Sequence, residues 1–195
     1  MLAKKSLDII LASASPRRVD LLNQIGVFPA RIVPANIDET PITGESPRQL
    51  VSRLSLSKAS LVSKENPESF ILAADTVVAC GRRIIPKAES LDQARSFLCL
   101  LSGRRHRVIT GLAIISPDGK LNKRIVETHV TIKRLSSIEL KQYLESGEWE
   151  DKAGAYAIQG LAAQFVKSIN GSYSNVVGLP LFETAQLLRG LGCYR

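Results

Sequence analysis

Apolar residues gather into short continuous runs bounded by polar turns, a pattern typical of buried β-strands. Asp75 interrupts one such run, an unusual place for a carboxylate. The segment Pro117–Lys120 carries a turn signal between two runs, which predicts an antiparallel hairpin. The predicted strands are Leu7–Leu11, Phe28–Pro34, Phe70–Cys80, Ile84–Ile85, Arg107–Ile115, Ile125–Ile132 and Phe165–Ile169.

Between these strands, apolar residues spaced three or four positions apart follow polar capping residues and predict helices. Ser15-Pro16 and Ser46-Pro47 each combine an N-cap with a proline at the first helical position. Ser136–Glu139 has the pattern of a capping box. The predicted helices are Pro16 to about Ile25, Ser46 to about Lys64, Asp92–Leu101, about ten residues from Ser136, and Pro180–Arg189. This mixture, with its hairpin, predicts an α/β fold with a mixed sheet.

The composition narrows the class of protein without fixing its ligand. The chain has 195 residues, is 45% hydrophobic and carries a net charge of +8. That charge favours anionic partners, and nucleic acid, an anionic membrane surface and a small polyphosphate would all satisfy it. No segment approaches the ~20 apolar residues of a membrane span, and residues 1–6 do not form a signal peptide. We therefore expect one soluble, cytoplasmic, two-lobed domain over residues 1–195.

The segment Ser13–Arg18 joins the first predicted strand to the first predicted helix. Free backbone N–H groups and the helix dipole favour an anion at such a junction. The hydroxyls of Ser13 and Ser15 and the guanidinium groups of Arg17 and Arg18 could bind phosphate oxygens. The alternative is that Ser15 only caps the helix and the arginines are solvated. The residues themselves leave both interpretations open.

Asp75 is the first candidate for acid–base or metal chemistry, because a carboxylate within a strand needs a partner or a cation. The alternative is that Asp75 ends the strand and caps a neighbouring loop. Glu39, in a polar loop, could supply a second carboxylate to Mg²⁺, which prefers one or two carboxylates plus phosphate and water. Lys58 and Lys87 could neutralise a polyphosphate. For Glu39 and both lysines, a purely solvated surface role remains open.

Ordered motifs along nearly the whole chain resemble those of the Maf family. Ser13–Arg18 resembles its Ser-x-Ser-x-Arg-Arg signature, and Glu39 and Lys58-Ala59 follow in order. The remaining matches are Ala74–Val78, Leu101–Arg104, Thr110-Gly111, Ala153–Gly160 and Gly171–Pro180. The chain departs from the family at Ile85–Ala88, where a Gly-Lys-Pro is usual around the second lysine, and Lys87 takes that place.

The resemblance implies an elongated fold like that of the inosine triphosphate pyrophosphatases, with a central cleft and often a homodimer. It implies metal-dependent cleavage, with Mg²⁺ or Mn²⁺, between the α and β phosphates of a nucleoside triphosphate. Asp75 and Glu39 would then bind the metal ion and position the attacking water, with Asp75 as the base. The phosphates would be held by Ser13, Ser15, Arg17, Arg18, Lys58 and Lys87.

The sequence Ala153–Gly160 resembles the branch of the family that acts on dTTP and UTP. In that case Thr76 and Gln159 are candidates for reading a pyrimidine. Two alternatives remain: a pyrophosphatase for a modified nucleotide such as 7-methyl-GTP, and a nucleic-acid-binding cell-division regulator. Against the second, aromatic residues are only 5% of the chain, and no nucleic-acid motif is present. We therefore expect a nucleoside triphosphate as the partner, with no stable nucleic-acid partner and no membrane.

Overall fold

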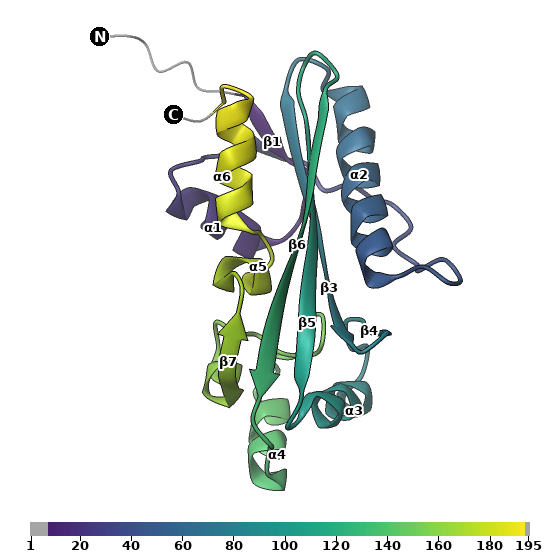
Figure 1. Cartoon of the computed structure of the whole chain (residues 1–195), viewed down its shortest axis with the longest axis vertical. Helices are drawn as coiled ribbons and strands as arrows, with labels where there is room; N and C mark the ends of the chain where they lie inside the picture. The colour runs from purple at the N-terminus through teal and green to yellow at the C-terminus, as the bar shows by residue number, and fades with distance from the viewer. Residues whose placement is uncertain (1–7, 194–195) are drawn as a thin grey trace.

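The computed structural model describes residues 8–193 and has the predicted α/β architecture. Leu7 of the first predicted strand and the N-terminal residues 1–6 lie outside the described residues. Seven strands form one sheet in the order β2-β1-β3-β5-β6-β7, with β4 paired to β3 (Figure 1). The strands are β1 Ile9–Leu11, β2 Arg31–Ile32, β3 Phe70–Cys80, β4 Arg83–Ile85, β5 Arg105–Ile115, β6 Leu121–Ile132 and β7 Val166–Asn170.

The sheet is mixed, as the hairpin signal predicts. β1 pairs in parallel with β2 and β3, whereas β3, β5, β6 and β7 pair antiparallel to one another. The long strands β3, β5 and β6 run along much of the molecule and give it its elongated shape (Figure 1). In this register Asp75 on β3 lies opposite Gly111 on β5.

Helices cover both faces of this sheet (Figure 1). A capping box at Ser136 opens α4, as the sequence predicts. The N-cap and first-turn proline predicted at Ser46-Pro47 open α2, where Ser46 also forms a capping box with Gln49. None of the described helices combines the length and apolar character needed to cross a membrane. The helices are α1 Pro16–Gln24, α2 Pro47–Glu65, α3 Leu91–Leu101, α4 Ser137–Glu145, the 3₁₀ helix η1 Leu161–Phe165, α5 Tyr173–Val177 and α6 Leu181–Gly190.

Side chains along β3 point alternately to the two faces of the sheet, so β3 contributes to the hydrophobic core on both faces. Leu72, Ala74 and Val78 join the large cluster built with α1, α3, α4 and α6. Ile71 and Ala73 join a separate cluster with Ala59 and Val62 of α2. Successive residues of β3 thus serve opposite faces, so Asp75 projects toward α2 and Thr76 toward α1.

Three local expectations need correction. The strand predicted over Phe28–Pro34 is only Arg31–Ile32, because this segment lies at the exposed sheet edge. Ser15 occupies the N-cap position of α1, but its side chain makes no capping hydrogen bond. The short helices η1 and α5 were not predicted, because five residues are too few to display a helical period.

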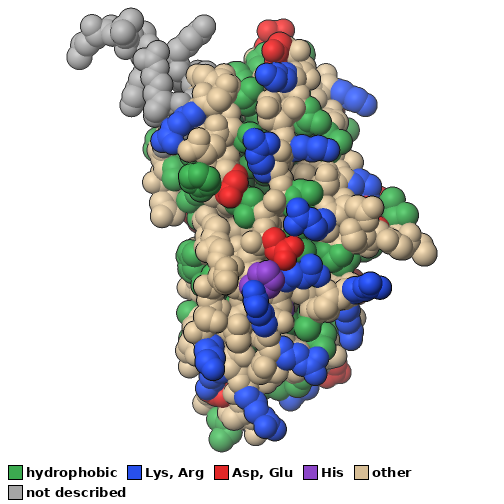
Figure 2. All heavy atoms as spheres, viewed as in Figure 1, with side chains coloured by type: hydrophobic (Ala, Val, Ile, Leu, Met, Phe, Trp, Pro, Cys, Tyr) green, Lys and Arg blue, Asp and Glu red, His purple; other side chains and the backbone are tan. Residues whose placement is uncertain are grey.

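Basic side chains are dispersed over the face visible in Figure 2, with acidic ones among them. Glu127, for example, lies within 4 Å of the charged groups of both Arg48 and Arg107. The net charge of +8 therefore does not mark a single nucleic-acid-binding patch on this face.

Candidate active site

A cleft of about 790 Å³ lies where β3, α2, the β1–α1 turn and two C-terminal loops meet. All ten residues singled out from the sequence line it, although they come from positions as far apart as 13 and 159. They are Ser13, Ser15, Arg17, Arg18, Glu39, Lys58, Asp75, Thr76, Lys87 and Gln159. The structure therefore brings every candidate residue to one cleft.

The Arg18 side chain contacts three separate segments at the cleft: the β1–α1 turn, β3 and the turn after α5. Its Nη1 donates to Ser13 Oγ at 2.8 Å, and its Nε donates to the Gly178 carbonyl at 2.9 Å. Its Nη2 lies 3.3 Å from Thr76 Oγ1. Burial lowers the pKa of Arg18, and the nearby Asp75 charge opposes this effect. Arg18 therefore fixes the β1–α1 turn against β3 and α5, and only part of its donor set is left for a ligand.

The neighbouring Arg17 is free to meet a ligand. Within residues 8–193 its side chain makes no hydrogen bond, and it faces the same cleft. Burial lowers its pKa, with Asp151 opposing. Because Ser15 does not cap α1, its hydroxyl remains available, and so does the Arg17 N–H. Pro16 has no N–H, and the Arg18 N–H donates to the Ser15 carbonyl at 3.2 Å. The arrangement favours the anion-site interpretation of this turn over the simple helix cap.

Lys58 bridges two carboxylates on the opposite side of the cleft. Its Nζ lies 2.7 Å from Asp75 Oδ1 and 2.6 Å from Glu39 Oε1. Lys58 comes from α2 and Asp75 from the face of β3 that α2 covers, and both side chains are only 10% exposed. Glu39 reaches the pair from its loop and is 54% exposed. Burial raises the pKa of Asp75, and the charge of Lys58 opposes that shift.

The carboxylates of Asp75 and Glu39 suit a hard divalent cation. Each places one oxygen within 2.7 Å of the Lys58 ammonium, so the two carboxylates lie close enough together for one cation beside Lys58 to meet both. Residues 8–193 contain no cluster of three or more His, Cys, Asp or Glu side chains that could form an all-protein site. Mg²⁺ and Mn²⁺ accept such an incomplete set when phosphate and water complete it. The donor set therefore fits a metal that binds together with a phosphate ligand.

Lys87 and Gln159 stand on a further wall of the cleft. A β-bridge pairs Lys87 with Ala153, which places the departure from the family motif beside the 153–160 loop. The Lys87 ammonium lies 3.9 Å from an Asp151 oxygen, and both side chains are largely exposed. Gln159 is also exposed at the cleft.

Lys152 is a cleft residue that sequence reasoning missed. Burial lowers its pKa, and the charge of Arg17 adds to that effect. It directly precedes the motif at Ala153–Gly160, which was the one signal that could have identified it. Lys152 extends the cationic wall formed by Arg17 and Lys87.

Thr76 is held rigidly beside Arg18. Its Oγ1 lies 2.9 Å from Thr110 Oγ1 and 3.3 Å from the Gly178 carbonyl oxygen. Thr110 in turn lies near the Asn175 carbonyl oxygen, and Asn175 is fully buried. The network joins β3 and β5 to the turn after α5, so a group recognised by Thr76 would meet a fixed hydroxyl.

Several known proteins are similar to this chain over most of its length. A dTTP/UTP pyrophosphatase from Paramagnetospirillum magneticum is 60% identical, with the alignment covering 94% of this chain and 97% of that protein. One of the same name from Caulobacter vibrioides is 56% identical over 94% of this chain and 95% of its own. A solved HAM1 protein from Coxiella burnetii aligns with 94% of this chain and 99% of its own at 15% identity, with a TM-score of 0.47. The model of the Maf-like proteins matches residues 8–191. The chain belongs to the Maf family.

Proposed function

We propose that this protein hydrolyses dTTP and UTP to the nucleoside monophosphate and pyrophosphate. The observation that carries the proposal is the buried Asp75–Lys58 pair, joined by Glu39, in the same cleft as the uncapped β1–α1 turn. The two pyrophosphatases at 60% and 56% identity carry the same activity in their names.

The phosphates would be bound by the cationic wall and the β1–α1 turn. Arg17, Lys87 and Lys152 reach the cleft from different segments and can each meet a different phosphate. The hydroxyls of Ser13 and Ser15 and the backbone N–H of Arg17 supply uncharged donors. Arg18 contributes mainly by fixing Ser13, since three of its contacts are already made within the protein.

Asp75 and Glu39 would hold Mg²⁺ or Mn²⁺ together with the substrate phosphates. A bound divalent cation of this kind supplies Lewis-acid stabilisation of charge on the phosphoryl oxygens. Lys58 offsets the charge of both carboxylates, which allows Asp75 to remain ionised although it is buried.

Asp75 is the general base in this proposal. Burial raises its pKa, which makes the carboxylate a better proton acceptor than a solvated one. It would accept a proton from the water whose oxygen forms the new bond to the α-phosphorus. The bond from the α-phosphorus to the α–β bridging oxygen breaks, and pyrophosphate leaves with the electron pair. Arg17, Lys87 and Lys152 offset the charge that develops on it.

Thr76 and Gln159 would select the base. Gln159 can donate and accept hydrogen bonds at a pyrimidine edge, and the Thr76 hydroxyl is fixed by its neighbours. A modified purine such as 7-methyl-GTP is the competing substrate, and a nucleic-acid-binding role is the competing function.

The decisive experiment is pyrophosphate release from dTTP, UTP, CTP and 7-methyl-GTP side by side, with Mg²⁺ or Mn²⁺. The proposal expects dTTP and UTP to be preferred. It also expects Asp75→Asn to lower kcat by about 10²–10⁴-fold while nucleotide binding is largely kept. A fully active Asp75→Asn enzyme would contradict the assignment of the base. Preference for 7-methyl-GTP, or salt-dependent oligonucleotide binding without turnover, would favour the competing functions.

Two further expectations belong to this proposal. The protein is expected to form a homodimer, which light scattering tests, and to reside in the cytoplasm, which cell fractionation tests.

A further inference from the structure

The loop that carries Glu39 has no regular secondary structure, yet Glu39 meets Lys58 at 2.6 Å. Glu39 is itself half exposed, and among residues 8–193 its one salt bridge is to Lys58. A flexible loop would lose conformational entropy on fixing the Glu39 carboxylate in one position. Other contacts between this loop and the rest of the protein must therefore restrain it.

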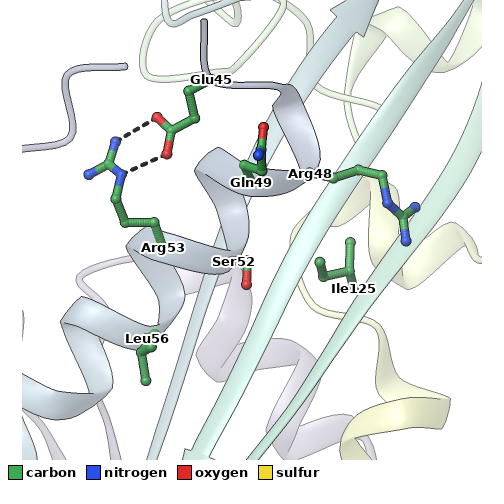
Figure 3. A pocket seen from close by; sticks show the side chains of 7 residues that line it. All are labelled: Glu45, Arg48, Gln49, Ser52, Arg53, Leu56 and Ile125. Carbon is green, nitrogen blue, oxygen red and sulfur yellow. Dashed lines mark hydrogen bonds and ion pairs between the residues drawn. The ribbon is translucent and has the colours of Figure 1, made fainter. Parts of the chain in front are cut away.

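Arg53 on α2 supplies that hold. Its Nε and Nη2 donate to Glu45 Oε1 and Oε2 at 2.7 and 2.8 Å, a two-bond pairing that Figure 3 shows. Its Nη2 also lies 3.1 Å from the carbonyl oxygen of Thr40, the residue that follows Glu39. One guanidinium thus contacts the loop at both Thr40 and Glu45.

The remaining contacts of the loop complete the restraint. The Thr40 N–H donates to Asp38 Oδ1 at 2.9 Å, so Thr40 is fixed through both its N–H and its carbonyl. The Ile42 N–H donates to Glu45 Oε2 at 3.1 Å. The Glu45 side chain is only 8% exposed and that of Arg53 29%, and the hydrogen bonds from Arg53 lower the pKa of Glu45. The Arg53–Glu45 pair is therefore better shielded than a typical surface salt bridge.

Arg53 acts from outside the cleft. Leu50, Leu54 and Lys58 of α2 line the cleft, whereas Arg53 and Arg48 line a separate pocket of about 450 Å³ (Figure 3). Two sides of α2 thus contribute to the site. One side carries Lys58, and the other binds the loop that places Glu39 beside Lys58.

We propose that Arg53 is a positioning residue for Glu39, fixing the loop from Thr40 to Glu45 so that the Glu39 carboxylate faces the Lys58 ammonium and a divalent cation. The inference rests on the proposed function, in which Glu39 is a metal ligand. Residues that orient a metal ligand in this way typically change metal affinity by about 10–100-fold when they are removed.

The test is Mn²⁺ binding to the full-length protein, followed by the electron paramagnetic resonance signal of free Mn²⁺. Arg53→Met is expected to weaken Mn²⁺ binding about tenfold and to raise the Mn²⁺ concentration for half-maximal turnover, with little change of kcat at saturating Mn²⁺. Arg48→Met is the matched control, because Arg48 lies on the same helix and pairs at 3.4 Å with Glu127 on β6. A purely structural defect would instead lower kcat and leave Mn²⁺ affinity unchanged.

A double-mutant cycle with Glu39→Gln decides whether Arg53 acts through Glu39. In the Glu39→Gln background, Arg53→Met is expected to cause no further loss of Mn²⁺ affinity. An equal loss in both backgrounds, or the same loss in Arg48→Met, overturns the proposal. If Glu39→Gln weakens Mn²⁺ binding and Arg53→Met does not, the role of Arg53 alone fails. If Glu39→Gln binds Mn²⁺ normally, the metal assignment in the proposed function fails with it.

Two measurements protect the test against misfolding. Arg53→Lys keeps the charge but cannot contact both Glu45 oxygens and Thr40 at once, so its Mn²⁺ affinity is expected to lie between those of the wild type and Arg53→Met. Hydrogen exchange at the Ile42 amide, which donates to Glu45, is expected to quicken in Arg53→Met and not in Arg48→Met. Unchanged exchange in Arg53→Met contradicts the proposal.

Discussion

Replacing Gly111 by alanine tests how closely α2 packs on the sheet. A Cβ at this position would lie 2.2 Å from the carbonyl oxygen of Val51 and 2.9 Å from Ser55 Oγ, both on α2. Carbon and carbonyl oxygen atoms stay about 3.3 Å apart or more, so α2 must retreat from β5 by about 1 Å. The obstacle is helix backbone, which cannot turn aside as a flexible side chain can.

This retreat reaches the candidate site because Gly111 lies opposite Asp75 in the sheet. The Lys58 Nζ to Asp75 Oδ1 distance is 2.7 Å, and a shift of about 1 Å takes it beyond hydrogen-bond range. A misplacement of that size can lower turnover about 100-fold. Overpacking also costs roughly 1–3 kcal/mol, and each kcal/mol lowers Tm by about 2–4 °C in a chain of this size.

The assay combines thermal unfolding with pyrophosphate release from dTTP. Gly190→Ala is the matched control, since a Cβ there meets no atom within 4 Å. We expect Gly111→Ala to lose both Tm and turnover, while Gly190→Ala keeps both. A Gly111→Ala protein with unchanged Tm and turnover would refute the close packing of α2 on β5.

Two further predictions concern buried polar groups. Burial lowers the pKa of His106 to about 4. As the pH falls through 6.5, the His106 imidazole therefore stays neutral in the folded protein, whereas it becomes protonated in the unfolded chain. The free energy of unfolding is therefore expected to decrease by at most about 3 kcal/mol between pH 6.5 and pH 4, and denaturant titrations should find this component missing in His106→Gln. Lys58→Met leaves the Asp75 carboxylate buried without its partner, which is expected to cost about 3 kcal/mol of unfolding free energy. Adding Asp75→Asn to Lys58→Met should restore part of that loss, and a double variant no more stable than Lys58→Met would count against the ion pair.

The regular elements of this fold were largely predictable from local patterns. β3 has the bounds that its apolar run predicts, and the Ser46-Pro47 signal of an N-cap and a first-turn proline marks the start of α2. Both signals depend on residues close together in the sequence. The strand predicted over Phe28–Pro34 is longer than the observed β2, Arg31–Ile32. The length of an edge strand depends on pairing partners that its own sequence does not specify.

The sequence was sufficient to predict which residues form the candidate site, but not how they contact one another. All ten residues reach one cleft, yet nothing local indicated that Lys58 would contact Glu39 and Asp75 together. That contact depends on how a long loop is anchored to α2 through Arg53, which resembles any other surface arginine in the sequence. Likewise, Arg18 is largely committed to Ser13, Thr76 and Gly178, which the Arg-Arg pair alone could not indicate.

The bond from Arg18 to the Gly178 carbonyl also has a consequence for the order of events during synthesis. Its two partners are 160 positions apart in the chain, so the β1–α1 turn emerges from the ribosome long before its anchor. A nascent chain from which the turn after α5 has not yet emerged can form β3 and the β5–β6 hairpin, but Arg18 then lacks one of its three contacts. If this turn binds phosphate as proposed, nucleotide binding is expected only near the end of translation.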